Sequence, residues 1–243
     1  MEAIDTTLRL ETGGESGELV GYEVPITAYP TESGKVIVNS PGSGELKDGR
    51  GDRWKNLGHH LQERGLASLV TYNAPRPDFQ VQLEWEPYSY QGASWNKILI
   101  ESLCHTIDWS LENAVQLCGN ESPAIYLTGF SSGGSAAGAA AHRYPSVQRL
   151  LLLSTYDSVG DPFYEGVSNF TGDIYMVYGD EDPMAGYLAR ILRTGKFAAK
   201  SFLVREAPGC GHRFDGEANT RLITQAFHWA FGGDNSQPLN ADG

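Results

Sequence analysis

The chain has 243 residues, enough for one large domain with a substantial buried core. Its 18 basic and 30 acidic residues give a formal net charge of -12, which disfavours nucleic-acid or anionic membrane partners because their phosphates would be repelled. The sequence shows no signal peptide, no membrane-spanning apolar run, and three cysteines that lack the spacing of a disulfide framework or zinc site. We therefore expect a cytoplasmic protein without a metal ion.

The first part of the chain alternates strand-like and helix-like segments. Residues 17–29 are expected to form one or two strands, with Gly21 as a candidate turn or bulge, and residues 35–40 form a short β-branched run. Residues 51–65 carry apolar side chains at helical spacing, and residues 67–73 return to strand character. This alternation is typical of an α/β protein.

A long helix is predicted next, after a segment rich in proline and aromatic residues at 74–93. The helix should run from Ser94, as N-cap, to Cys118, and Gly119 should close it. Its apolar residues are expected to share one face: Ile98, Leu99, Leu103, Ile107, Leu111, Ala114 and Val115.

The second half of the chain repeats this alternation. Its expected strands are 124–130, 149–155, 173–179 and 201–208, and its expected helices are 134–142, 184–196 and 218–231. Near-continuous apolar strands alternating with helices predict a mostly parallel central sheet of about seven or eight strands with helices on both faces. We expect one domain over residues 1–232 and a polar, disordered tail at 233–243.

A nucleophile motif lies between the strand 124–130 and the following helix. Gly129-Phe130-Ser131-Ser132-Gly133 has the form G-x-S-x-G. When a nucleophile lies on a sharp strand-to-helix turn, side chains two residues before and two residues after it would collide, and glycine at both positions avoids this. This frame selects Ser131, because choosing Ser132 would put bulky Phe130 at the crowded position.

With these residues the chain resembles the α/β-hydrolase family, whose catalytic triad follows the chain order serine, acid, histidine. Gly179 and Asp182 match the family's G-x-x-D pattern after a strand, and His212 stands in the usual place of the histidine, after the last predicted strand. The resemblance covers residues 17–231 and implies the triad Ser131, Asp182 and His212. It also implies that no cofactor is needed, and the chain has neither a P-loop nor a dinucleotide fingerprint.

The acid has two alternatives. Asp180 lies in the same turn as Asp182, and Asp157 follows the preceding strand, where some members of the fold carry their acid. A structural role for Asp182 is also open, because it precedes Pro183 in the position of a helix N-cap. We rank Asp182 first and Asp157 second.

The resemblance also implies an oxyanion hole made of two backbone N–H groups. One should come from Ser132, after the nucleophile, and the other from Ser43 in the loop Pro41-Gly42-Ser43-Gly44. Pro41 replaces the histidine that is common in the family at this place. The alternative for this loop is a flexible turn.

The length of one connection bears on the substrate. Many members of the family insert a helical cap between the strands here ending near Thr155 and starting at Asp173, but only the 17 residues 156–172 are available. We therefore expect little or no cap domain, as in the small members similar to dienelactone hydrolases, carboxylesterases and thioesterases. Four aromatic residues of the long proline-rich segment are candidates for the pocket wall or for loop packing: Phe79, Trp85, Tyr88 and Tyr90.

The resulting functional hypothesis is a serine hydrolase acting on an ester or thioester of a small-molecule acyl substrate. Acyl transfer, cyclisation and peptide cleavage on the same triad remain alternatives, as does a catalytically idle binding protein with this fold. Cys210, two residues from His212, is interpreted as a packing residue.

Overall fold

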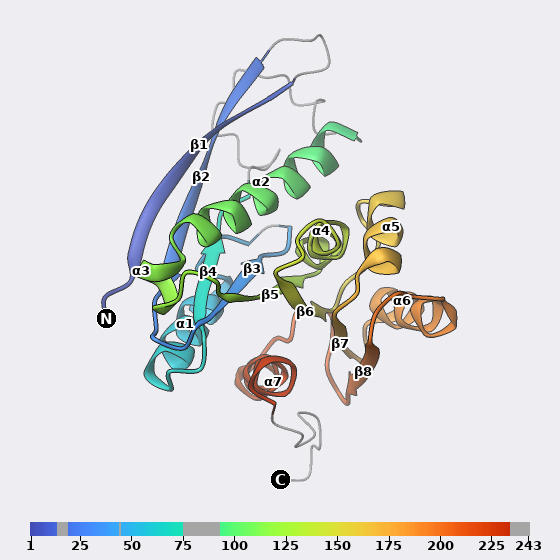
Figure 1. Cartoon of the computed structure of the whole chain (residues 1–243). Coiled ribbons are helices and arrows are strands. Elements are labelled where there is room, and N and C mark those ends of the chain that lie inside the picture. Colours follow the sequence, from blue (N-terminus) through green and yellow to red (C-terminus); the bar gives the residue numbers. More distant parts are fainter. Residues whose placement is uncertain (14–18, 44, 75–92, 234–243) are drawn as a thin grey trace. The chain divides into compact units, whose positions relative to one another are not determined.

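A computed structural model describes residues 1–13, 19–43, 45–74 and 93–233 of the chain (Figure 1). The chain divides into two compact units, Met1–Pro123 and Ala124–Gly243. The predicted pocket aromatics Phe79, Trp85, Tyr88 and Tyr90 and most of the polar tail lie outside the described residues.

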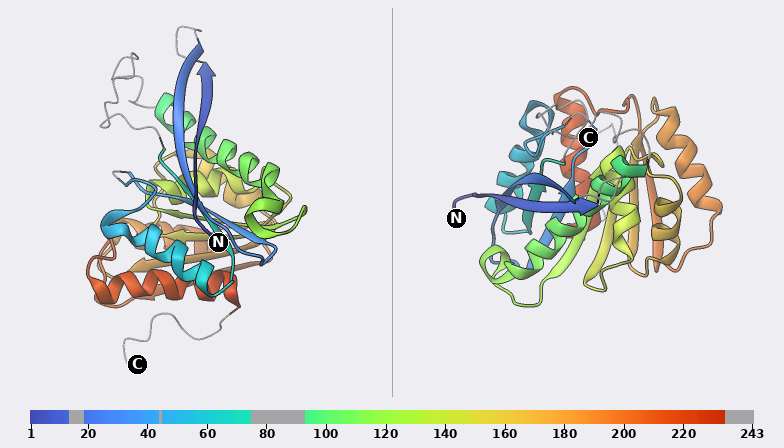
Figure 2. Two further views of the ribbon diagram at one scale, coloured as in Figure 1. Left: turned by 90° about the vertical axis from the view of Figure 1, so that its left-hand side faces the viewer. Right: turned by 90° about the horizontal axis from the view of Figure 1, so that it is seen from above.

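The first unit contains four strands in the order β1-β2-β4-β3. β1 (Ile4–Gly13) and β2 (Leu19–Tyr29) form a long antiparallel ribbon (Figure 2), β2 pairs antiparallel with β4 (Ser68–Tyr72), and β4 pairs parallel with β3 (Lys35–Ser40). The helices of this unit are η1 (Arg50–Asp52), α1 (Arg53–Glu63), α2 (Ala93–Glu112) and α3 (Ala114–Cys118). α1 and α2 lie on opposite faces of its strands.

Two expectations for this unit, the role of Gly21 and the single long helix, need correction, and one strand was not predicted. β1 was not anticipated, although the alternation of Ile4, Thr6, Leu8 and Leu10 is typical of a strand. β2 is one continuous strand, and Gly21 pairs in regular register with Glu11, so it forms neither a turn nor a bulge.

The long predicted helix is two helices, α2 and α3, with a break at Asn113. The Asn113 side-chain amide donates to the Trp109 carbonyl, and its backbone φ and ψ, -105° and 19°, are not helical. Val115, expected on the buried face, is 59% exposed, whereas Leu117 and Cys118 are buried. Gly119 closes α3 with a φ of 73°, as predicted.

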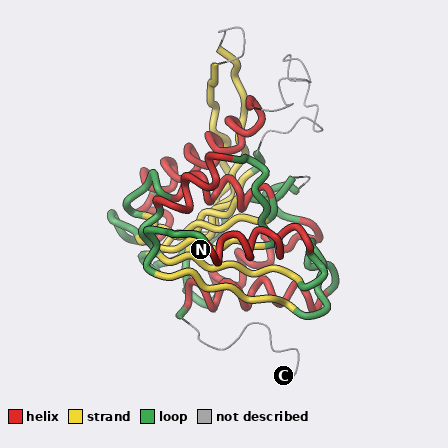
Figure 3. Tube along the Cα trace, turned by 90° about the vertical axis from the view of Figure 1, so that its right-hand side faces the viewer, coloured by secondary structure: helices red, strands yellow, loops and turns green. Residues whose placement is uncertain are grey.

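The second unit contains β5 (Ala124–Phe130), β6 (Val147–Leu153), β7 (Asp173–Gly179) and β8 (Ser201–Ala207), all parallel and in that order. Its helices are α4 (Ser132–Ala141), α5 (Asp161–Asn169), α6 (Pro183–Thr194), α7 (Glu217–Phe227) and the π-helix η3 (His228–Gly232). α4, α5 and α6 lie on one face of the strands and α7 on the other (Figures 1 and 3). Burial on both faces explains the run Leu150–Leu153, in which every side chain is inaccessible to solvent.

Small residues let α4 pack closely against α5. A Cβ at Gly166 would overlap the Gly138 carbonyl, and a Cβ at Gly138 would come within 2.5 Å of the Phe163 ring. This approach fixes the alanine-rich helix that follows Ser131. Besides α5, no helix lies between β6 and β7, and both the connection and its flanking strands are fully described, so no large cap is inserted there.

The predicted fold class is confirmed: in the residues that the structure describes, eight strands, mostly parallel in their pairings, alternate with helices. Within the described ranges, no helix is both long and apolar enough to cross a membrane.

Candidate active site

Ser131 lies on a sharp turn between β5 and α4. Its backbone φ and ψ are 57° and -122°, a left-handed conformation that is strained for a residue with a side chain. Its N–H donates to the Leu153 carbonyl at 2.9 Å, which ties the turn to the end of β6. The strained backbone predicted for a nucleophile in this motif is therefore present at Ser131, whereas Ser132 is the first residue of α4.

Glycine is required two residues before Ser131. A Cβ at Gly129 would overlap the Gly133 backbone and come within 2.5 Å of the Gly134 nitrogen. Gly134 is just as confined, because its own Cβ would overlap the Thr155 hydroxyl. Gly129 of the motif and Gly134 just after it therefore allow the close crossing of strand and helix that presents Ser131.

His212 meets Ser131 from the loop that follows β8. The Ser131 Oγ lies 3.0 Å from His212 Nε2. The imidazole is partly exposed, and the Phe130 and Tyr156 rings lie beside it at centroid distances of 5.4 and 6.2 Å. The sequence analysis did not assign either aromatic residue to the site. Phe130 is the last residue of β5 and Tyr156 lies three residues after the end of β6, and these places at the carboxyl ends of the strands are the signal that would have found them.

Asp182 meets the other side of the imidazole from the loop that follows β7. Its Oδ2 lies 2.7 Å from His212 Nδ1, and its Oδ1 accepts the Ala185 N–H at 3.2 Å. Burial of this carboxyl raises its pKa, but the hydrogen bonds from His212 and from the Ala185 N–H outweigh burial and hold the pKa below its usual range. An ionised carboxylate accepts the Nδ1 proton and leaves Nε2 free to accept from Ser131. Asp182 is therefore both a helix N-cap and the partner of His212.

The two alternative acids make other contacts. Asp157 Oδ2 accepts the Tyr164 hydroxyl at 2.6 Å. Asp180 Oδ1 accepts the Cys210 N–H at 3.2 Å. Of the three candidates, Asp182 is the one that the structure places against His212.

Cys210 is fully buried beside this site. Burial raises the pKa of its thiol to about 11, with further increases from Asp180, Glu181, Asp182 and Asp215. The reactive form of cysteine is the thiolate, so this thiol is a poor nucleophile at neutral pH. This agrees with its interpretation as a packing residue.

The two predicted oxyanion donors lie in different units of the chain. Ser132 is at the N-terminus of α4, where backbone N–H groups and the helix dipole favour negative charge. Ser43 is exposed in the loop after β3, in which the Glu45 N–H donates to the Gly42 carbonyl at 3.0 Å. Their joint action on one oxyanion stays a prediction. In the described part of the chain, no cluster of His, Cys, Asp and Glu has the arrangement of a metal site.

Comparison with known proteins identifies the fold. No family model and no curated protein sequence matches the chain. Among solved structures, a dienelactone hydrolase from Anabaena variabilis aligns with a TM-score of 0.66 and 16% identity over 93% of this chain and 99% of that one. The α/β hydrolase GrgF from Penicillium sp. aligns with a TM-score of 0.62 and 15% identity over 96% and 100% of the two chains. A cold-adapted esterase from an Arctic intertidal metagenomic library gives a TM-score of 0.65 and 12% identity over 94% of each chain.

These likenesses define the class: the chain has the α/β-hydrolase fold, as its sequence motifs predicted. Within that fold it is similar to small hydrolases of nearly its own length, because each alignment covers more than nine tenths of both chains.

Proposed function

We propose that this protein is a serine hydrolase that cleaves a carboxylic ester or thioester of a small molecule through an acyl-enzyme. One observation carries the proposal: Ser131, His212 and Asp182 form a continuous hydrogen-bonded chain with distances of 3.0 and 2.7 Å. A scaffold with no catalytic task has no physical need for this chain on a strained turn. The hydrolase and esterase named among the similar structures support the same chemistry.

The proposed reaction begins when His212 Nε2 removes the Ser131 proton as Oγ attacks the substrate carbonyl. Asp182 holds the imidazole in the required tautomer and stabilises the imidazolium. The N–H of Ser132, at the start of α4, stabilises the tetrahedral oxyanion. His212 then gives its proton to the leaving alcohol or thiol, and water, activated by the same imidazole, releases the acid. No step requires a cofactor.

The test is hydrolysis of p-nitrophenyl esters of increasing acyl length by the wild type and by Ser131→Ala. We expect wild-type turnover and a loss of about 10⁴-fold or more in the variant, because the residues of a triad act as a unit. A fluorophosphonate probe should label the wild type and leave Ser131→Ala unlabelled. The optimal acyl length measures the size of the pocket.

The other outcomes separate the alternatives. Labelling without turnover of any ester or thioester favours acyl transfer, cyclisation or peptide cleavage on the same residues. A folded wild type that neither turns over nor reacts with the probe contradicts the proposal and favours an idle binding protein.

A further inference from the structure

The loops that follow β7 and β8 are held together beyond the end of the sheet. The last strand pair is Gly179 with Ala207. After it, the Asp180 N–H donates to the Ala207 carbonyl at 3.0 Å, and the Glu181 N–H donates to the Cys210 carbonyl at 3.1 Å. The Asp180 carboxylate completes the set by accepting the Cys210 N–H at 3.2 Å. We call these three hydrogen bonds the loop clamp.

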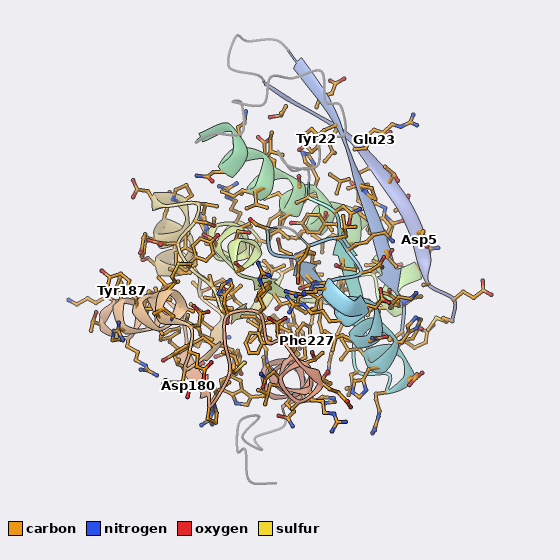
Figure 4. The ribbon with its side chains drawn as sticks, turned by 180° about the vertical axis from the view of Figure 1, so that it is seen from behind. Asp5, Tyr22, Glu23, Asp180, Tyr187 and Phe227 are labelled. Atoms are coloured by element: carbon orange, nitrogen blue, oxygen red, sulfur yellow. The ribbon has the colours of Figure 1, made fainter. Side chains whose placement is uncertain are left out.

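The loop clamp brings the two loops into close contact. A Cβ at Gly179 would overlap the Cys210 carbonyl, so glycine is required at the point where the loops meet. Cys210 is fully buried and Asp180 is exposed at the edge of the second unit, below Tyr187 of α6 in Figure 4. Asp180 is the one residue that contributes a side chain to the clamp, and its charge strengthens the bond that this side chain accepts.

We propose that Asp180 is a positioning residue that holds the histidine loop against the acid loop. Asp182 directly follows the clamp residue Glu181, and His212 lies two residues after Cys210 on the opposite loop. Their separation of 2.7 Å therefore depends on how the loops are joined. The proposal rests on the proposed hydrolase function, to which it adds a residue that touches neither substrate nor the reacting atoms.

The expected size of the effect follows from the geometry of general-base catalysis. Displacing a catalytic group by about 1 Å can cost roughly 100-fold in rate even when the substituted residue is remote from the chemistry. Loss of the clamp should move His212 relative to both Asp182 and Ser131. Ser131 and α4 lie outside the clamp, so we expect substrate binding to be affected little.

The test compares three substitutions at one position. Asp180→Asn keeps an acceptor oxygen in place and removes the charge, Asp180→Glu keeps the charge and displaces the oxygen by one methylene, and Asp180→Ala removes both. We expect kcat within about threefold of wild type for Asp180→Asn, and a loss of roughly 10- to 100-fold for Asp180→Glu and Asp180→Ala, with KM within about twofold. Glu181→Gln removes a neighbouring charge and keeps its backbone N–H, so it should retain the wild-type kcat.

A second readout does not depend on turnover. The proton between His212 Nδ1 and Asp182 should give a low-field ¹H NMR resonance in the wild type, assigned by its loss in His212→Gln. We expect the resonance to persist in Asp180→Asn and to shift or broaden beyond detection in Asp180→Glu. This measurement tests the loop clamp even if the wild type hydrolyses no ester, a result that counts against the proposed function alone.

Two results would overturn the positioning role. Losses of kcat in Asp180→Asn and Glu181→Gln, with a wild-type kcat in Asp180→Glu, mean that charge, and not the position of the accepting oxygen, matters. An unchanged kcat and an unchanged resonance in Asp180→Glu mean that the clamp does not position His212. If Asp180→Ala does not fold, the kcat values of Asp180→Asn and Asp180→Glu still test the proposal. A role for acceptor position predicts the higher kcat in Asp180→Asn, whereas a role for charge predicts the higher kcat in Asp180→Glu.

Discussion

Asp182 uses its two carboxylate oxygens for different tasks. Oδ1 accepts the Ala185 N–H at the start of α6, and Oδ2 faces His212. The N-cap bond fixes the side-chain rotamer, so the second oxygen is already oriented toward the imidazole before substrate binds. The structural and the catalytic interpretations of this residue are therefore compatible, and one supports the other.

The lowered pKa of Asp182 predicts how stability depends on pH. A carboxyl whose pKa is lower in the folded than in the unfolded state stabilises the fold above its unfolded pKa, about 3.9. That contribution is lost as the pH falls through the depressed folded pKa, because the unfolded state binds the proton first. The free energy of unfolding of the wild type should therefore fall on acidification from about pH 5.

The measurement is urea unfolding of the wild type and of Asp182→Asn between pH 7 and pH 3. We expect the difference in unfolding free energy between them to shrink below about pH 4, because the variant lacks the titrating group. Glu121→Gln, a change at an exposed carboxyl, is the control for the removal of one negative charge. If the unfolding free energies of the wild type and of Asp182→Asn change with pH in parallel, Asp182 is not the group whose protonation destabilises the fold.

Among the structural elements, those that position the triad were the most predictable. The nucleophile turn could be predicted because the strand, the glycines and the helix around Ser131 are neighbours in sequence. The places of Asp182 and His212 could be predicted because loops that follow parallel strands lie at the same edge of the sheet. Asp182 was harder to separate from Asp180 and Asp157, because which carboxyl reaches His212 depends on loop geometry. The hydrogen bonds of Asp157 to Tyr164 and of Asp180 to Cys210 resolve the choice.

The misplaced elements have local physical causes. Apolar spacing continues across Asn113, so the sequence predicts one helix, but the backbone of Asn113 is not helical. There the Trp109 carbonyl accepts both the backbone N–H and the side-chain amide of Asn113. Ion pairs between elements also cannot be predicted from the sequence pattern. The buried pair of Glu45 and Arg53 joins the loop after β3 to the start of α1, and neither residue belongs to a motif.

This ion pair makes a prediction for the first unit. Arg53 Nη2 lies 2.6 Å from Glu45 Oε1, both side chains are less than one tenth exposed, and the Trp54 indole N–H donates to Glu45 Oε2 at 3.0 Å. Arg53→Met should lower the free energy of unfolding by about 3–5 kcal/mol, because it leaves the Glu45 charge buried without the Arg53 guanidinium. Combining it with Glu45→Gln, which keeps an acceptor for the indole, should recover most of that loss.

Urea unfolding of the single and double variants measures the effect. Lys97→Met breaks the partly exposed pair of Lys97 and Glu101, 3.7 Å apart, and should change the unfolding free energy by only about 0.5 kcal/mol. A double variant no more stable than Arg53→Met alone would show that the buried charge is not the cause.

At the scale of the whole molecule, the net charge of -12 bears on which substrates reach the site. Exposed Asp180, Glu181 and Asp215 lie in the loops around His212, where Arg213 is the one neighbouring cation in sequence. The resulting negative potential should lower the local concentration of anionic substrates. At 0.01 M salt the screening length is about 30 Å, and at 0.1 M it is about 10 Å, so added salt should weaken this repulsion.

We therefore predict a salt-dependent preference for neutral over anionic esters. The ratio of kcat/KM for a p-nitrophenyl ester with an acyl carboxylate to that for a neutral ester of equal length should rise several-fold between about 10 and 200 mM salt. A cationic ester should show the opposite trend, because salt screens its attraction. The neutral ester is the control for effects of salt on folding or chemistry. A ratio that does not change with salt would contradict the proposed repulsion of anionic esters by the exposed negative charges of the molecule.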